Sequence, residues 1–417
     1  MKIDNVKLDS EWVLAQFPLL ADGAGDFSFF DNAGGTFPCV QSNSISETFY
    51  NQYKMQPYGA TEKQAEAGRL MDVGRAKMAE LVGVEITDLT YGPSTTQNFN
   101  NLAHALTDHI MTGDEIVVTN QDHEANIGCW ERLVQLKGAK LVFWQVDAGG
   151  ELQLDDLRQI LSGKTKIVSF THSSNIIGSI NNVNEIADLV VDTCAQKPLI
   201  FADGVSYAPH NLPDIGKLNV DAYCFSTYKT FGTHMGIMYA SKRLTKLARA
   251  QCHFFNIGVK NYSVFDAAGP DHAAIASLAG IADYYADFAR HHGMNDVKNL
   301  NDARAFACAI MHEAETALLS ELLAFLAAKP NVTIYGRSGV AGREANVAFR
   351  VEGVSSQSIV AALGANNIGA KYGHFYAYRL IQALGLDLDD GVVRLSYAHY
   401  LTKADNDRLI AALDEIF

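Results

Sequence analysis

Hydrophobic and polar positions follow a regular alternation between about residues 87 and 240. Short runs in which nearly every position is apolar predict strands that are buried on both faces. Stretches with helical spacing separate these runs, and this alternation predicts a mostly parallel sheet that is covered by helices. The predicted strands are 115–120, 140–146, 166–172, 198–204, 221–226 and 236–241, and the clearest intervening helices are 97–110 and 183–196.

The pattern changes after about residue 270. Two long helical stretches are followed by short strands mixed with helices, which predicts an α+β unit. The long helices are 272–292 and 301–328, the short strands are 332–337, 345–351 and 392–397, and a last helix lies near 403–416.

We therefore expect an α/β protein with two domains. Residues 26–285 form the large domain, with a mostly parallel sheet covered by helices. Residues 286–417 form a smaller α+β domain at the C-terminal end, and the segment 1–25 packs against it. A chain of this length is long enough to support both domains around a large shared core.

Composition narrows the functional class. The 417 residues are 48% hydrophobic and 19% charged, and the net charge of −14 argues against a nucleic-acid-binding protein. No apolar run approaches the length of a membrane span, and the first residues contain no apolar core of a secretory signal. The six cysteines are scattered without a CxxC pair, which favours a cytoplasmic protein with reduced thiols and no metal site.

Ligands of an open parallel sheet bind beyond the carboxyl ends of its strands, so we looked there for candidate site residues. Thr95 and Thr96 lie where a helix begins, which suits a phosphate, although such hydroxyls are equally typical of helix capping. His123 follows a predicted strand and could stack on a flat ligand. Asn175 follows another strand and could bind a ligand hydroxyl. Taken singly, a structural histidine and an asparagine in a turn are the simpler interpretations.

Asp203 lies near the end of one predicted strand, and Lys229 follows the end of the next one. Burial of a carboxylate or an ammonium is costly unless the group is paired or chemically used. One cofactor accounts for all five features. Pyridoxal 5'-phosphate (PLP) needs a lysine for its Schiff base, an acid at its ring nitrogen, a flat group on its ring, a donor to its phenolic oxygen and a phosphate cup. No metal-ligand spacing, P-loop or Ser-His-Asp signature competes with this interpretation.

The chain resembles the class V aminotransferase and cysteine desulfurase group of fold-type I PLP enzymes over nearly its whole length. This resemblance implies a large domain with a seven-stranded type of sheet, an amino-acid substrate, and a homodimer with its active sites at the interface. The motifs that carry it are FDNAGGTFP at 30–38, STTQNFN at 94–100, DHEANIGCW at 122–130, HSSNIIGSIN at 172–181, ADGVSYAPH at 202–210, STYKTFG at 226–232 and RLSYAHYLT at 394–402.

The resemblance also implies a role for each matched residue. The cofactor is expected to contact Thr95, Thr96, Ser226 and Tyr228 through its phosphate, His123 through its ring face, Asn175 and Ser206 near its phenolic oxygen, Asp203 through its ring nitrogen, and Lys229 through the aldimine. The substrate side is expected to contain Arg394 for the carboxylate, together with Asn32, Gly34 and His374.

The chain departs from the family at several positions. Tyr376 stands where desulfurases of this group carry a nucleophilic cysteine, and a phenol cannot accept sulfur as a persulfide. Lys371 and Phe375 replace an arginine and a histidine in the same loop. Ser206 replaces a glutamine, and Gly269 offers only its backbone N–H where relatives carry a threonine. These changes argue against the desulfurase reaction, while PLP binding is still expected.

Three functions stay open at this point. The first is a PLP-dependent aminotransferase-like enzyme that acts on a small amino acid. The second is a C–S lyase that works by β-elimination, or an epimerase, without persulfide chemistry. The third is a non-catalytic protein with the PLP fold, against which the presence of both Asp203 and Lys229 argues. Tyr376 and His374 could take part in the chemistry, although a place at the rim is the simpler expectation.

Overall fold

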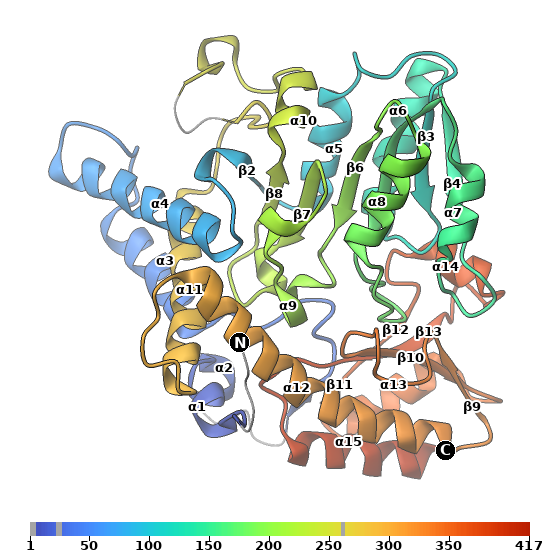
Figure 1. Cartoon of the computed structure of the whole chain (residues 1–417). Helices are drawn as coiled ribbons and strands as arrows, with labels where there is room; N and C mark the ends of the chain where they lie inside the picture. Colours follow the sequence, from blue (N-terminus) through green and yellow to red (C-terminus); the bar gives the residue numbers. More distant parts are fainter. Residues whose placement is uncertain (1–5, 22–26, 260–262) are drawn as a thin grey trace.

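The computed structural model describes residues 6–21, 27–259 and 263–417. Parts of the expected N-terminal segment, residues 1–5 and 22–25, lie outside the described residues. A seven-stranded sheet occupies the upper part of the molecule, and a small sheet lies below it (Figure 1). The order of the large sheet is β2-β8-β7-β6-β5-β3-β4, with β2 at Leu89–Gly92, β3 at Glu115–Thr119, β4 at Lys140–Trp144, β5 at Thr165–Thr171, β6 at Leu199–Asp203, β7 at Ala222–Ser226 and β8 at Gly236–Ala240.

The prediction of a mostly parallel sheet is confirmed, with one antiparallel strand. β8 runs antiparallel to both of its neighbours, β7 and β2, whereas the other pairings are parallel. Only residues 227–235 connect β7 to β8. A parallel return needs a crossover of about a dozen residues or more, so this short connection reverses the direction of the chain.

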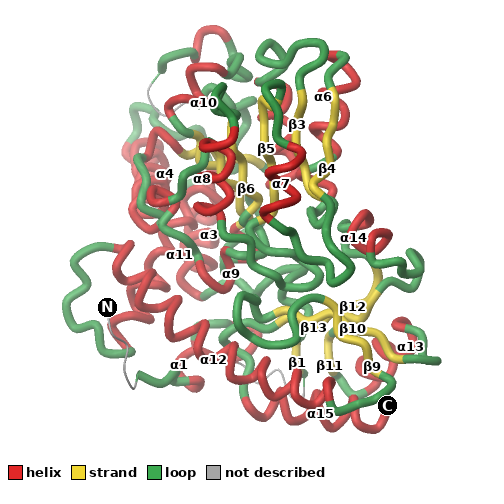
Figure 2. The backbone as a smooth tube through the Cα atoms, turned by 45° about the vertical axis from the view of Figure 1, so that its right-hand side comes forward, coloured by secondary structure: helices red, strands yellow, loops and turns green. Residues whose placement is uncertain are grey.

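Both faces of the large sheet are buried, which explains the continuous apolar strands. Along β7, Ala222 and Cys224 pack on one face while Tyr223 and Phe225 pack on the other. One face is covered by α5 (Thr95–Ala105), α6 (Gly128–Lys137) and α10 (Lys242–Leu247), and the opposite face by α7 (Leu154–Ile160), α8 (Val183–Thr193) and α9 (Ala208–Asn211). Figure 2 shows α7 and α8 in front of the strands. The helices predicted at 97–110 and 183–196 end earlier than expected, at Ala105 and Thr193.

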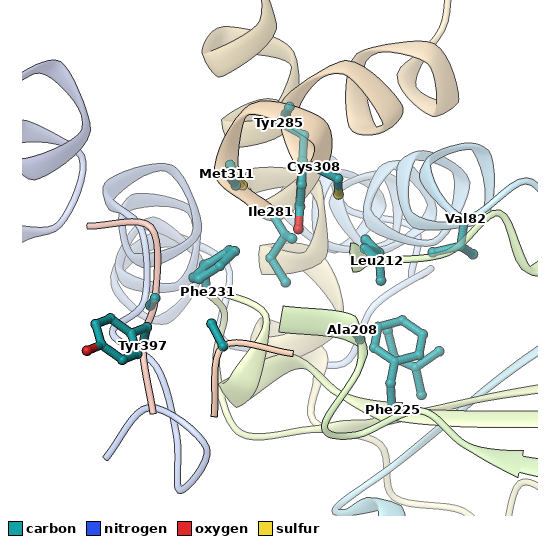
Figure 3. Close-up of a cluster of buried hydrophobic side chains, with 14 of the residues drawn as sticks. Val82, Ala208, Leu212, Phe225, Phe231, Ile281, Tyr285, Cys308, Met311 and Tyr397 are labelled. Atoms are coloured by element: carbon teal, nitrogen blue, oxygen red, sulfur yellow. The ribbon is translucent and has the colours of Figure 1, made fainter. Parts of the chain in front are cut away.

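A second helical layer joins the large sheet to the rest of the chain. α11 packs against α3, α4 and α12. In Figure 3, Phe225 of the sheet lies on one side of the core, and Tyr285 of α11 and Met311 of α12 lie on the other. The bounds of this layer are α3 Val40–Gln52, α4 Glu62–Leu81, α11 His272–His291 and α12 Leu300–Ala327.

The N-terminal helix lies on α11. α1 (Ser10–Ala15) presents Trp12, whose ring stacks on Tyr284 and on His291 with centroid distances of 6.3 and 4.6 Å. α2 (Pro18–Ala21) follows directly. The expected boundary at residue 285 falls inside the continuous helix α11, and the exact division into domains stays a prediction.

The small sheet is antiparallel in the order β12-β13-β10-β9. A separate parallel pair joins β1 to β11 and so connects residues 28–29 to the C-terminal part of the chain. The strands are β1 Ser28–Phe29, β9 Val332–Tyr335, β10 Asn346–Val351, β11 Ile368–Gly369, β12 Lys371–Gly373 and β13 Val392–Ser396, and the helices are α13 Ser356–Ala365, α14 Tyr378–Ala383 and α15 Lys403–Ile416. Short 3₁₀ turns occur at Ile86–Asp88, Glu124–Asn126, Ile215–Lys217, Thr227–Lys229 and Phe254–Asn256. Across the described residues, every helix is too short or too polar to cross a bilayer.

Candidate active site

Lys229 is buried just beyond the end of β7. It is the last residue of the 3₁₀ turn Thr227–Lys229, and it is 8% exposed. Desolvation and the nearby charge of Arg394 lower the pKa of Lys229 to about 8, against the opposing effects of Asp203 and Asp31. The amine is therefore closer to its neutral, nucleophilic form than an ordinary lysine at neutral pH.

Asp203 lies at the end of β6, beside Lys229. Because β6 and β7 are parallel neighbours, both strands deliver their terminal residues to the same edge of the sheet. Desolvation raises the pKa of Asp203 to about 6, and a hydrogen bond of 2.9 Å from the Val205 N–H to Oδ1 opposes that rise. A carboxylate buried in this way gains from a cationic ligand group.

His123 presents a neutral ring on the same side of the sheet. It precedes the 3₁₀ turn Glu124–Asn126, and its Nδ1 accepts a hydrogen bond of 3.0 Å from the Ala125 N–H. Desolvation, together with the charges of Lys229 and Arg394, lowers the pKa of His123 to about 4. The imidazole is therefore uncharged at neutral pH, and its orientation is fixed by its own backbone, as a flat stacking group requires.

The start of α5 forms an anion cup with the end of β7. Ser94 is the N-cap, since its hydroxyl accepts from the Gln97 N–H at 3.1 Å, so Thr95 and Thr96 are not needed for capping. Thr95 is buried, and its hydroxyl lies 2.7 Å from that of Ser226, whereas Thr96 is exposed. Backbone N–H groups and hydroxyls in this arrangement suit a phosphate.

One glycine, Gly236, and one tyrosine, Tyr228, lie next to the same cup. A Cβ on Gly236 would lie 2.5 Å from the Thr95 nitrogen, so this glycine lets β8 approach the start of α5. Tyr228 is partly buried next to Lys229, and its ring is stacked on the imidazole of His234.

Arg394 reaches the site from β13 of the small sheet. Its Nη2 donates to Oδ1 of Asp31 at 2.7 Å, and its Nη1 donates to the Asn175 carbonyl oxygen at 3.0 Å. The ring of Phe375 lies 3.9 Å from the guanidinium carbon. Lys371 also pairs with Asp31, at 3.3 Å. Arg394 is 3% exposed, so a substrate carboxylate would meet a guanidinium that is already held in place.

Two other expected site residues, Asn175 and Asn32, form hydrogen bonds with the rest of the protein. Asn175 donates from its side chain to the Phe375 carbonyl oxygen at 2.9 Å. Asn32 donates to the carbonyl oxygens of Phe29 and Ser396, at 2.8 and 3.0 Å, and accepts from the Tyr400 hydroxyl. These contacts make Asn32 a bridge between the loop after β1 and the end of β13.

The remaining candidates lie at the rim or in close backbone contacts. A Cβ on Gly34 would lie 2.9 Å from Oδ2 of Asp31, so the glycine permits this tight loop. His374 Nδ1 accepts from the Tyr376 N–H at 3.2 Å, and Tyr376 is 69% exposed. Ser206 lies in the turn after β6 and is partly exposed.

Sequence reasoning missed Asp31, the stacking of Phe375 on Arg394, and His234. Asp31 lies within the motif at 30–38, and an acid shortly before two glycines was a usable signal. The contact of Phe375 with Arg394 had no such signal, because it depends on backbone with φ of 47° at Phe375 and 60° at Tyr376, values that are unusual for such residues.

The residues present fit PLP. The cup, the neutral ring of His123, the acid Asp203 and the desolvated amine of Lys229 converge on the carboxyl edge of the large sheet. Among residues 6–21, 27–259 and 263–417, no group of three or more histidine, cysteine or acidic side chains is arranged to hold a metal ion.

Comparisons with known proteins agree with this geometry. The family model for class-V aminotransferases matches residues 28–409. The chain is 34% identical to the aminotransferase-like protein FGM3 of Gibberella zeae, over 97% of this chain and 98% of that protein. It is 29% identical to the cysteine desulfurase-like protein ustD of Aspergillus flavus, over 99% and 92% of the two chains.

Solved structures share the fold. The cysteine desulfurase CsdA of Escherichia coli has a TM-score of 0.82 at 22% identity, covering 98% of both chains. The cysteine desulfurase of Thermococcus onnurineus has a TM-score of 0.83 at 21% identity, covering 100% of this chain and 98% of its own.

Proposed function

The chain belongs to the class-V aminotransferase family, whose members depend on PLP, and we propose that it is an enzyme that acts on a small amino acid through Lys229. The observation that carries the proposal is the location of two buried groups at one edge of the sheet: Asp203 ends β6, and Lys229 lies just beyond the end of β7, the adjacent parallel strand. Each is a titratable group whose pKa is displaced toward neutrality by burial, and such groups are characteristic of functional sites.

When bound, PLP supplies a carbonyl for covalent attachment of an amine and an electron sink for negative charge at the substrate Cα. The chain's residues supply the rest. With PLP bound, Asp203 would hold the ring nitrogen in its charged form, and the flat imidazole of His123 would lie against the ring. Lys229 would hold the cofactor, and its Nζ would serve as the group that moves a proton at the substrate Cα.

Arg394 orients the substrate through its α-carboxylate. A guanidinium presents two parallel N–H donors to a carboxylate, and this fixes which Cα bond faces the reacting group. Asp31 and the Asn175 carbonyl oxygen hold the guanidinium in place before substrate binds. The position of Arg394 therefore favours amino acids with a free α-carboxylate.

Transamination is the favoured reaction, supported by the family match and by the similarity to a protein named aminotransferase-like. The alternative is β-elimination or epimerisation, supported by similarity to a protein named cysteine desulfurase-like. Persulfide chemistry is not part of the proposal, because exposed Tyr376 occupies the loop position of the desulfurase nucleophile. We further propose a homodimer located in the cytoplasm, in line with the six free cysteines.

The experiment is a panel of L- and D-amino acids incubated with purified protein and no keto acid, with Lys229→Ala as the control. Consumption of one equivalent per site that resumes on addition of a keto acid identifies an aminotransferase. Continuous release of ammonia and a keto acid identifies a lyase, and loss of optical activity alone identifies an epimerase. A protein that consumes none of them, and whose spectrum PLP does not change, would be the non-catalytic alternative.

A further inference from the structure

His234 lies beside the anion cup and has no role in the function described so far. It belongs to the short connection between Lys229 and β8. Its imidazole stacks on the ring of Tyr228, with centroids 4.5 Å apart and planes that differ by 3°. Its Nδ1 lies 3.2 Å from the carbonyl oxygen of Pro93, the residue directly before the N-cap of α5.

These two contacts connect the two sides of the cup. A carbonyl oxygen only accepts hydrogen bonds, so the proton lies on Nδ1 of His234. The imidazole therefore joins the start of α5 to the residue next to the catalytic lysine. The remaining polar atom, Nε2, has no hydrogen-bond partner in the described part of the chain, and the residue is exposed.

The geometry points to His234 as a further positioning residue for the phosphate of the cofactor, an inference that rests on the proposed PLP function. The stack fixes the ring of Tyr228, and the bond to Pro93 fixes the imidazole. An imidazole that is protonated on both nitrogens would then donate from Nε2 to a phosphate oxygen. Ser226 and Thr95, whose hydroxyls lie 2.7 Å apart, approach the same phosphate from the buried side.

His234 would thus complete a cup whose other donors are hydroxyls and backbone N–H groups. An imidazole can bring positive charge to a bound dianion, which hydroxyls cannot do.

The experiment compares the affinity of PLP with that of pyridoxal, which lacks the phosphate, in apoprotein that carries Lys229. His234→Phe keeps a flat ring against Tyr228 but loses both nitrogens. We expect its dissociation constant for PLP to rise about tenfold, the equivalent of one hydrogen bond, and that for pyridoxal to stay within about twofold of wild type. His253→Phe, in an exposed segment, is the matched control and should change neither constant.

A second variant separates the stack from the nitrogens. His234→Gln keeps an N–H that can reach Pro93 but removes the ring. We expect this variant, too, to bind PLP more weakly and pyridoxal as wild type does. Combining His234→Phe with Tyr228→Phe should cost less than the sum of the single losses, because both act on one phosphate. Equal losses for PLP and pyridoxal, or no loss for either, would overturn the inference. A wild-type protein that binds neither compound would instead overturn the proposed function, and this inference with it.

Discussion

Asp31 and Arg394 form a buried ion pair of 2.7 Å that joins the loop after β1 to β13, residues 363 positions apart in the sequence. The two side chains are 7% and 3% exposed. Burial of an arginine on this scale is costly without a counter-charge, and Asp31 supplies that charge and fixes the position of the guanidinium. A substrate carboxylate must then bind to an arginine whose charge is already partly compensated.

Arg394→Lys should mainly weaken substrate binding. A lysine keeps the charge but loses the two parallel N–H donors, and the loss of a charge-assisted hydrogen bond raises KM by roughly 10- to 100-fold. Steady-state kinetics on the amino acid found in the panel would measure this. Arg350→Lys is the matched control, because Arg350 lies on β10 of the same sheet and also pairs with an acid, Asp390. An unchanged KM for Arg394→Lys would remove Arg394 from the substrate site.

Asp203→Asn should reduce turnover while PLP still attaches to Lys229. An amide cannot keep a ring nitrogen charged, so the electron sink is weakened, and kcat should fall by roughly 100- to 1,000-fold. Asp203→Glu keeps the charge and should lose much less. The check is kcat together with cofactor content per site. Full cofactor content with wild-type kcat in the asparagine variant would contradict the assigned role.

Lys229 should react as a free amine at a lower pH than ordinary lysines. Its pKa is lowered to about 8, so the neutral amine forms as the pH rises through about 8 and is complete well below the ordinary value of 10.5. Reductive methylation of the apoprotein with isotopic formaldehyde, followed by peptide mass analysis, would follow this step. Labelling of exposed Lys298 in the same samples serves as the reference. A midpoint for Lys229 near 10.5 would contradict the desolvated site.

Incubation with cysteine should leave no persulfide on the protein. The thiolate is the form that attacks sulfur, and desolvation raises the pKa of Cys39 and Cys129 to about 12 and of Cys308 to about 11. Burial also raises the pKa of Cys224. Mass spectrometry of alkylated peptides would detect the modification. Persulfide on the partly exposed Cys252 would show that this chain has moved the desulfurase nucleophile to another loop.

The sequence predicted those features that depend on a single segment, namely the strands of the large sheet and the residues at their ends. The continuous apolar runs predicted the strands of the large sheet closely, because burial on both faces leaves little choice of residue type. The strand-end positions then brought Asp203 and Lys229 to one edge, as expected of parallel neighbours. The reversal of β8 was also implicit in the nine-residue connection, although the pattern of apolar positions does not show it.

The rest depends on contacts between distant segments. Asp31 meets Arg394 only because β1 pairs with β11 and the loop after it meets β13. Phe375 covers Arg394 because two adjacent residues adopt left-handed backbone, held by hydrogen bonds from Asn175 and Glu124 to the loop carbonyl oxygens. Local propensity disfavours that conformation, so no sequence pattern predicts it.

The most direct test of the central claim is to locate the covalent attachment of PLP. Borohydride reduction converts a lysine-bound cofactor into a stable secondary amine, which peptide mass spectrometry assigns to one residue. We predict that the phosphopyridoxyl group lies on Lys229 and disappears in Lys229→Arg. A reduced cofactor on another lysine, or none in protein that was saturated with PLP before reduction, would contradict the account.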